Sequence, residues 1–498
     1  MNQENQLTKR TFSGFLYLLS ASGLQVVLKI GVLAVLARLI SPKEFGLAGI
    51  AVIIVEFSKL FAHMGVGPAI VQRKELEDRH LTTAFTLSIL TGLFFAGLLV
   101  LAAPLLETFF RMEGLVPILR TIAVVFFIDS LTVLGQAQLQ RAMKFKVIAS
   151  VEVISYAVGY GGVGILLAYL GYGVWALAIA NIAQAVLYAT AVTIVQPSKH
   201  RLGLEKDAMK ELLVFGGGFT IAKIGNFLAN QGDNLVVGRM LGAGALGIYG
   251  RAYQFMVMPA GLFGNALDRS LFPAMSKVQD DKERLIKGYL TGTSIIALAA
   301  IPISVLFVFM APEIILILLG KNWVDVILPF RILACSLLFR MSYKMSDSLA
   351  RATGAVYKRA WRQIAYATAV IGGSYFGSRW GLPGVACGVA FALVLNFLMM
   401  THLSLRLTGI GWGKVLEAHK HGLLLGMVTV VFCSIMSFLC RQLDTWPVLT
   451  LAGTVLGVGL LLVVSIWLFP NLFIRHDQKE LLNKLVVKRF KKIPARAA

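Results

Sequence analysis

Long apolar stretches recur along this chain and constrain its fold more than any other feature. From about Phe12 to Pro470, runs of roughly 20 or more mostly apolar residues alternate with short polar connections. An α-helix rises about 1.5 Å per residue, so about 20 residues cross the hydrocarbon core of a bilayer. The runs are too long for the strands of a membrane barrel. The sequence therefore predicts an all-α membrane protein with about 14 transmembrane helices.

The composition favours the same fold class. Of the 498 residues, 57% are hydrophobic and only 14% are charged, which is typical of membrane proteins rather than soluble domains. The first apolar run follows Lys9 and Arg10 but continues to Ile40 without a small-residue cleavage site, so we expect it to be retained as a helix. The four cysteines have neither disulfide nor metal-ligand spacing. We expect no metal site and no cofactor.

Lysine and arginine gather at every second connection between the apolar runs. They are frequent around Arg73, Arg141, Lys206, Lys282 and Lys358, whereas connections such as 169–173 hold few charges. Loops rich in these residues remain in the cytoplasm. The pattern predicts that both termini are cytoplasmic and that the helix count is even. Because this topology accounts for the net charge of +22, we do not expect nucleic acid as a partner.

Two passages of the chain match at a constant offset. LARLISPKEFGL, after the first predicted helix, matches VGRMLGAGALGIY, after the seventh, and places Arg38 and Gly46 on Arg239 and Gly247. The repeat predicts two pseudo-symmetric bundles of six helices, inserted in the same sense, plus two C-terminal helices. The predicted divisions are an N-terminal lobe (1–195), a cytoplasmic linker (196–209), a C-terminal lobe (210–408), helices 13 and 14 (409–470) and a basic cytoplasmic tail (471–498).

Several predicted spans contain cations, although a charge in the hydrocarbon core costs at least about 2.5 kcal/mol. Such residues normally face a water-filled cavity. A cavity with positive walls favours an anionic cargo, and phosphate is the usual one. The predicted cationic substrate site consists of Lys29, Lys59, Lys223, Arg269, Arg340 and Lys344.

Three carboxylates in the spans are candidates for coupling transport to Na⁺ or H⁺, namely Asp233, Glu56 and Asp347. Asp233 ends a polar stripe of helical periodicity that begins at Lys223. Two of the cations could instead form structural ion pairs, Lys59 with Glu56 and Lys344 with Asp347, and the sequence leaves both interpretations open. Asp129 and Glu152 also lie in predicted spans, without an evident partner in the sequence.

Three segments resemble the polysaccharide-export flippases of the Wzx type, in the MOP superfamily of lipid II flippases and MATE exporters. They are LARLISPKEFGL, DNLVVGRMLGAGALGIYGRAYQ and FPAMSKVQDDKERL. The resemblance implies a MOP/MATE-like fold with alternating access in the bacterial inner membrane. It implies that the cargo is an undecaprenyl-pyrophosphate-linked oligosaccharide, for exopolysaccharide, capsule or O-antigen assembly. It also implies that the first, second, seventh and eighth helices line the central cavity, which would fit Lys29, Lys59 and Lys223. Membrane lipids, a polysaccharide polymerase and chain-length machinery are the partners it suggests.

Other functions fit the sequence less well. No Walker sequence, zinc-ligand spacing or nucleophile elbow occurs, so we expect a transporter and not an enzyme. An ion-coupled MATE-like exporter of small molecules is the alternative. It would present carboxylates and aromatic side chains to its cavity, and the excess of lysine and arginine argues against it.

Overall fold

The structure, a computed structural model, describes residues 23, 25–73, 75–197, 202–442 and 446–473. Within them, the side chains of 215–219, 221–222, 265–274, 441 and 471 are not described. The predicted basic tail therefore lies almost wholly outside the described residues. Every regular element in the described part of the chain is helical, and no strand occurs there. The all-α fold class is confirmed.

Residues 25–39 continue the first predicted helix. The elements that follow are α2 (Pro42–Ala62), α3 (Val66–Gln72), α4 (Asp78–Phe110), α5 (Leu115–Ile122), α6 (Val124–Arg141), α7 (Phe145–Tyr156), η1 (Ala157–Gly164), α8 (Ile165–Tyr169), α9 (Val174–Val195), α10 (Lys206–Lys277), α11 (Lys282–Phe309), α12 (Ala311–Leu318), η2 (Lys321–Val326), α13 (Ile327–Cys335), α14 (Leu337–Ala352), α15 (Val356–Gly377), η3 (Ser378–Trp380), α16 (Gly381–Thr408), α17 (Trp412–Gln442), α18 (Pro447–Leu468) and α19 (Pro470–Phe473).

Nine helical segments in the described residues are long and apolar enough to cross a membrane. One of these segments, 356–408, contains both α15 and α16, so it is long enough for two crossings. The start of the first predicted helix lies outside the described residues. The count of about 14 helices and the division into two six-helix bundles therefore stay predictions.

Helix α10 has 72 residues and is broken at Gly242, where φ is 85° and ψ is −178°. A straight helix of that length would measure about 108 Å, far more than a bilayer of about 30 Å can hold. Glycine adopts this positive φ readily because it has no Cβ. The break separates residues 206–241 from 243–277, which correspond to the seventh and eighth helices predicted from the sequence.

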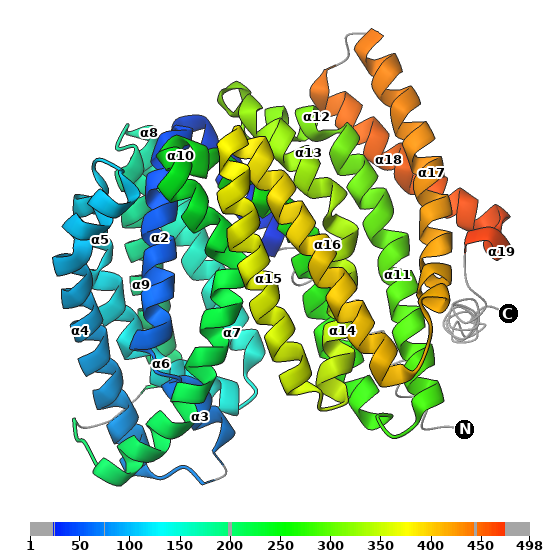
Figure 1. Cartoon of the computed structure of the whole chain (residues 1–498). Coiled ribbons are helices and arrows are strands. Elements are labelled where there is room, and N and C mark those ends of the chain that lie inside the picture. The colour runs from blue at the N-terminus through cyan, green and yellow to red at the C-terminus, as the bar shows by residue number, and fades with distance from the viewer. Residues whose placement is uncertain (1–22, 24, 74, 198–201, 443–445, 474–498) are drawn as a thin grey trace, which may run out of the picture.

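The connections between helices lie at two ends of the molecule (Figure 1). We call one the Gly46 end; it carries the start of α2, the turns α4–α5 and α8–α9, and the break in α10. The opposite end carries the connections α3–α4, α6–α7, α10–α11 and α14–α15. We call it the basic end because lysine and arginine gather there. They include Arg73, Arg141, Lys144, Lys146, Lys277, Lys282, Arg284, Lys287, Arg351, Lys358 and Arg359.

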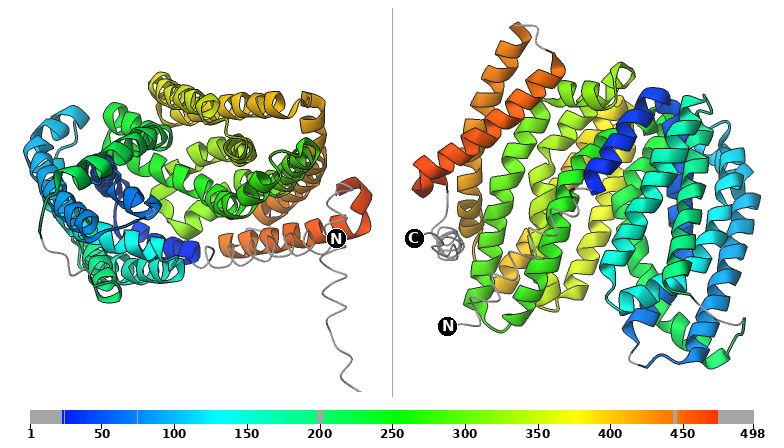
Figure 2. Two further views of the ribbon diagram at one scale, coloured as in Figure 1. Left: turned by 90° about the horizontal axis from the view of Figure 1, so that it is seen from below. Right: turned by 180° about the vertical axis from the view of Figure 1, so that it is seen from behind.

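Two groups of helices stand side by side, with α2 to α9 on one side and α11 to α16 on the other, while α17 and α18 lie at the outer edge (Figures 1 and 2). Helix α10 packs along α2 and also against α15 and α14, so it joins the two groups. One apolar core runs through both groups, with Ile50, Tyr249 and Phe330 fully buried in it. We call the groups the first half and the second half, and α10 belongs to the second.

The halves touch closely at the Gly46 end. A Cβ atom on Gly46 would lie 1.7 Å from the carbonyl oxygen of Ala243, and one on Gly247 would lie 1.9 Å from that of Pro42. Only glycine fits such an approach of two backbones. Nearby, Trp323 Nε1 donates to the carbonyl oxygen of Ala37 at 2.7 Å, and this indole is fully buried. The halves are therefore closed against each other at this end.

Candidate functional site

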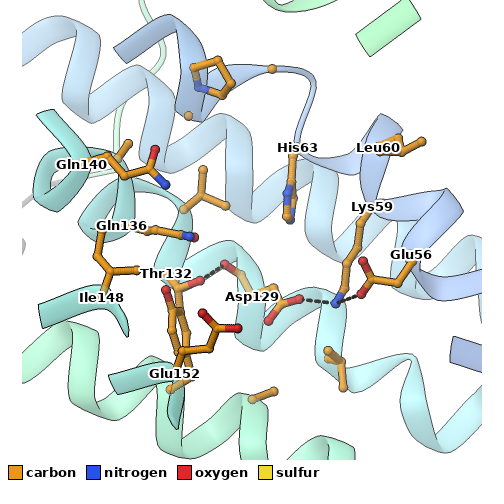
Figure 3. A pocket seen from close by; sticks show the side chains of 18 of the residues that line it. Glu56, Lys59, Leu60, His63, Asp129, Thr132, Gln136, Gln140, Ile148 and Glu152 are labelled. Carbon is orange, nitrogen blue, oxygen red and sulfur yellow. Dashed lines mark hydrogen bonds and ion pairs between the residues drawn. The ribbon is translucent and has the colours of Figure 1, made fainter. Parts of the chain in front are cut away.

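A polar cavity of about 780 Å³ lies among helices of the first half and reaches α10 at Thr220 and Lys223 (Figure 3). Its walls come from α2, α3, α6, α7, α9 and α10. The side chains that face it are rich in amides, hydroxyls and charges. These polar lining residues are Glu56, Lys59, His63, Asp129, Thr132, Gln136, Gln140, Glu152, Asn181, Gln184, Tyr188, Thr220 and Lys223.

Lys59 lies between two carboxylates in the wall of this cavity. Its Nζ is 2.9 Å from Glu56 Oε1 and 2.7 Å from Asp129 Oδ2 (Figure 3). The side chains of Lys59 and Asp129 are 17% and 20% exposed, whereas that of Glu56 is 54% exposed. The pairing of Lys59 with Glu56, left open by the sequence, is present. The second partner, Asp129, comes from α6 and was not evident from the sequence.

Glu152 connects the first predicted helix to the cavity. Lys29 Nζ lies 3.9 Å from Glu152 Oε1, and Gln25 Nε2 donates to the same oxygen at 3.3 Å. The ammonium of Lys29 also lies 5.5 Å from the centre of the Tyr156 ring. Both partners of Glu152 come from a helix more than 100 residues earlier, which explains why sequence spacing did not indicate them.

The remaining predicted cations belong to the second half. Arg340, on α14, is only 7% exposed; its Nη2 donates to Asn230 Oδ1 at 3.3 Å and its guanidinium lies 5.2 Å from the Tyr253 ring centre. Lys344 is half-buried on the same helix. The side chain of Arg269 lies outside the described residues. The structure thus brings Lys59 and Lys223 to one cavity, with Lys29 beside it, and places Arg340 and Lys344 elsewhere. Substrate binding by these residues stays a prediction.

Only one of the three predicted coupling carboxylates, Glu56, lines the described cavity. Asp233 is 1% exposed and accepts hydrogen bonds from the Tyr249 hydroxyl at 2.8 Å and from the Asn234 backbone N–H at 2.9 Å.

Asp347 does not take the partner that helix spacing suggested. This carboxylate is 8% exposed and pairs with Arg351, at 3.2 Å, and with Arg359. Within the described residues, Lys344 forms no ion pair with it. The Lys344–Asp347 pair, left open by the sequence, is not present among the described residues, where Arg351 and Arg359 pair with the carboxylate.

Sequence reasoning missed most of the uncharged lining. On α6, Asp129, Thr132, Gln136 and Gln140 recur at intervals of three, four and four residues, which puts them on one helix face. A search for polar stripes of either charged or neutral residues would have found this face, since the periodicity is the same as that used for Lys223.

The described lining is polar with nearly balanced charge. Three carboxylates accompany two lysines and one histidine, and the rest are amides, hydroxyls and apolar groups. Amide side chains both donate and accept hydrogen bonds, as sugar hydroxyls do. Such a cavity can bind a neutral or weakly charged sugar through many hydrogen bonds, and Lys223 adds a cation at the side of α10.

Comparisons with known proteins agree on a family and a fold. The sequence matches the family described as "Polysaccharide biosynthesis protein" over residues 35–328. It is 26% identical over 405 residues to the teichuronic acid biosynthesis protein TuaB of Bacillus subtilis (strain 168), covering 79% of this chain and 82% of that protein. It is 24% identical over 403 residues to the lipopolysaccharide biosynthesis protein WzxC of Escherichia coli (strain K12), covering 79% and 80%.

Solved structures with the same fold are membrane transporters. The lipid II flippase MurJ, in an inward closed conformation, matches with a TM-score of 0.73 and 16% identity, covering 92% of this chain and 100% of that one. An inward-facing multidrug resistance MATE transporter of the MOP superfamily matches with a TM-score of 0.61 and 16% identity, covering 77% and 95%. At this level of identity the likeness shows the fold alone.

Proposed function

Because this chain belongs to the polysaccharide biosynthesis protein family and has the MOP superfamily fold, we propose that it flips a lipid-linked oligosaccharide across the bacterial inner membrane. The cargo is an undecaprenyl-pyrophosphate-linked oligosaccharide, moved from the inner to the outer leaflet by alternating access. The product serves exopolysaccharide, capsule or O-antigen assembly. The chain acts as a transporter and not as an enzyme.

The polar cavity is the observation that carries this proposal. Its lining contains four amide side chains, from Gln136, Gln140, Asn181 and Gln184, together with hydroxyls. These groups can replace the water that surrounds sugar hydroxyls in solution. Lys223 can make a charge-assisted hydrogen bond to a phosphate oxygen.

The contact between the halves supports alternating access. The halves close at the Gly46 end through Gly46 and Gly247, whereas the polar cavity reaches α3 near Gly67 and Pro68. The lysine and arginine content of the basic end supports a cytoplasmic location for that end, and for both termini. In this orientation the cavity serves the cytoplasmic leaflet, where the cargo is made. Coupling to Na⁺ or H⁺ belongs to the proposal, and Glu56 is its cavity-lining candidate.

One observation favours the MATE-like exporter as a second candidate. Three carboxylates line the cavity, and carboxylates attract cationic drugs. Each of them lies within 4 Å of a lysine, Glu56 and Asp129 near Lys59 and Glu152 near Lys29. These ion pairs offset the negative charge, which makes the cavity less suited to a cation than to a polar sugar.

The decisive experiment compares two glutamines on one helix. Gln136 lines the cavity, while Gln138 is also half-buried but bonds to Gln196 outside it. In a strain lacking this gene, Gln136→Leu should restore less surface polysaccharide than Gln138→Leu at equal protein levels in the membrane. Equal restoration by both variants would refute the sugar site. A deletion strain with normal surface polysaccharide and raised sensitivity to cationic drugs would support the exporter instead.

A further inference from the structure

A second cavity, of about 1030 Å³, lies at the seam between the halves. Its walls come from α2 and α4 of the first half and from α10 and α15 of the second. The lining is apolar and rich in aromatic rings, and we call this cavity the aromatic groove. Its aromatic members are Phe57, Phe61, Phe95, Phe109, Phe110 and Tyr375.

The aromatic groove and the polar cavity occupy two faces of the same helix. On α2, Glu56 and Lys59 face the polar cavity, whereas Phe57 and Phe61 line the aromatic groove. The two cavities share no described lining residue. The aromatic groove is therefore a separate site and not an extension of the proposed sugar site.

The aromatic groove runs at membrane depth and ends at the Gly46 end. Its lining on α4 extends from Phe95 to Phe110 and continues to Arg111. Sixteen residues of helix measure about 24 Å, which exceeds half of a hydrocarbon core of about 30 Å. An apolar space of this size beside the bilayer core suits hydrocarbon chains rather than water.

Two arginines, one from each half, line the aromatic groove. Arg111 caps the C-terminus of α4 at the Gly46 end and is exposed; Arg239, on α10, is half-buried. The guanidinium of Arg239 lies 5.3 Å from the ring centre of Phe109, two residues before Arg111. Among the residues that the structure describes, no carboxylate lies within ion-pair distance of either arginine. Their charge is thus available to an anion at the end of the groove.

We propose that the aromatic groove binds one anionic phospholipid from the leaflet at the Gly46 end. Its acyl chains lie along the aromatic wall, and its head-group phosphate contacts Arg111 and Arg239. This site goes beyond the proposed function, because the phospholipid is not the cargo. A phospholipid fits better than the isoprenoid-linked cargo, since the cargo's polar head would be bound in the other cavity. Bound there, the lipid connects the two halves through its head group.

The test is native mass spectrometry of the full-length protein in mild detergent, with equal amounts of phosphatidylglycerol and phosphatidylethanolamine. We expect one retained phosphatidylglycerol in preference to phosphatidylethanolamine. Arg239→Gln should lower that preference roughly five-fold, which corresponds to about 1 kcal/mol for one arginine near a lipid head group. The double change with Arg111→Gln should remove most of it. Arg379→Gln is the matched control, since Arg379 is an exposed arginine 5.8 Å from the Phe376 ring but outside the groove.

A second variant tests the acyl-chain part of the site. Ala102→Phe puts a large ring into the groove lining and should abolish lipid retention while both arginines remain. If Ala102→Phe still retains phosphatidylglycerol, the lipid lies on the surface of the protein, and the acyl-chain site in the aromatic groove is refuted. The head-group site would be refuted if the double arginine variant kept its preference for phosphatidylglycerol. It would also be refuted if Arg379→Gln lost as much of this preference as Arg239→Gln. If Ala102→Phe fails to fold, the arginine variants alone decide. Lipid retention is measured without transport, so its result is independent of the proposed function.

Discussion

Gly46 and Gly247 pack against each other where α2 meets α10, and they are the aligned glycines of the internal repeat. A Cβ built on Gly46 would lie 3.0 Å from the backbone nitrogen of Gly247, and one built on Gly247 would lie 3.2 Å from that of Gly46. Two copies of a unit related by a two-fold axis touch at equivalent positions when those positions lie near the axis. The axis of the predicted pseudo-symmetry would therefore lie close to these two glycines.

The first prediction concerns this glycine contact. Gly46→Ala should lower the free energy of unfolding by about 1–3 kcal/mol, because the added methyl group overlaps the backbone around Ala243. Gly49→Ala, three residues later on the same helix, is the control, since a Cβ there meets nothing within 4 Å. Thermal unfolding midpoints in detergent compare the two. Equal midpoints would show that the halves separate easily at this end.

The second prediction concerns orientation. A reporter active only in the cytoplasm should be active when inserted at Asp280, in the basic end, and silent at Gly171, in the Gly46 end. The reason is the accumulation of lysine and arginine at the basic end. Reporter activity, normalised to the amount of fusion protein, is the measurement. An active fusion at Gly171 would reverse the orientation and place the polar cavity toward the other leaflet.

Much of the fold could be predicted because membrane helices leave a strong local signal. Apolar length gave the fold class, and the repeat gave the correspondence of Gly46 with Gly247. The contact between these residues was not predicted, because an alignment shows equivalence and not proximity. Similarly, the burial of Trp323 against Ala37 depends on how the halves close, which no local pattern encodes.

The third prediction concerns the ion pairs of Lys59. Asp129→Asn should lower the free energy of unfolding by about 1–3 kcal/mol, because it leaves a mostly buried ammonium with one partner. Glu56→Gln should cost at most about 1 kcal/mol, since the Glu56 side chain is more than half exposed and its charge is screened. Thermal unfolding of both variants at one pH is the measurement. A larger loss from Glu56→Gln would show that the exposed carboxylate is the main partner of Lys59.

The candidate site was predicted less completely than the fold. The polar cavity is lined by Lys59, Lys223 and Glu56, as expected for charged residues on a helix face that borders water. Asp129 was recognised as a charge within a span but not as a partner of Lys59, because the two residues lie on different helices. The neutral amides were missed because the free-energy cost of burying an amide is lower than that of burying a charge. An amide in an apolar run is therefore a weaker indication of a water-filled cavity.

The fourth prediction separates two roles for Asp233. If this carboxylate couples transport to a gradient, Asp233→Asn should abolish gradient-dependent transport while the protein remains folded. Tyr249→Phe should instead lower stability by about 1–3 kcal/mol, because the buried carboxylate loses a donor. Transport into proteoliposomes with an imposed gradient, beside thermal unfolding, distinguishes the two. Normal transport by Asp233→Asn would make the residue a structural partner of Tyr249.

The fifth prediction concerns two of the cations that the sequence assigned to the substrate site. Lys223 is exposed and lines the polar cavity, whereas Arg340 is buried against Tyr253. Lys223→Glu should therefore accumulate normally in the membrane, while Arg340→Glu should reduce the amount of protein, because a carboxylate cannot replace the stacked guanidinium. This difference makes Lys223 the better residue for testing substrate binding, because loss of the protein would hide any loss of binding.

A charge-assisted hydrogen bond contributes about 1.5–3 kcal/mol, so losing Lys223 should weaken cargo binding roughly 10- to 150-fold. Lys223→Glu should fail to restore surface polysaccharide in a strain lacking the gene, since it also repels the phosphate. Lys223→Arg should retain part of the activity because it keeps the charge. Lys210→Glu is the control, as Lys210 is exposed on the same helix but outside the cavity. Surface polysaccharide is measured against the protein level in membranes. Full restoration of surface polysaccharide by Lys223→Glu would mean that the cargo's phosphate is bound elsewhere. Arg340 would then be the next residue to test.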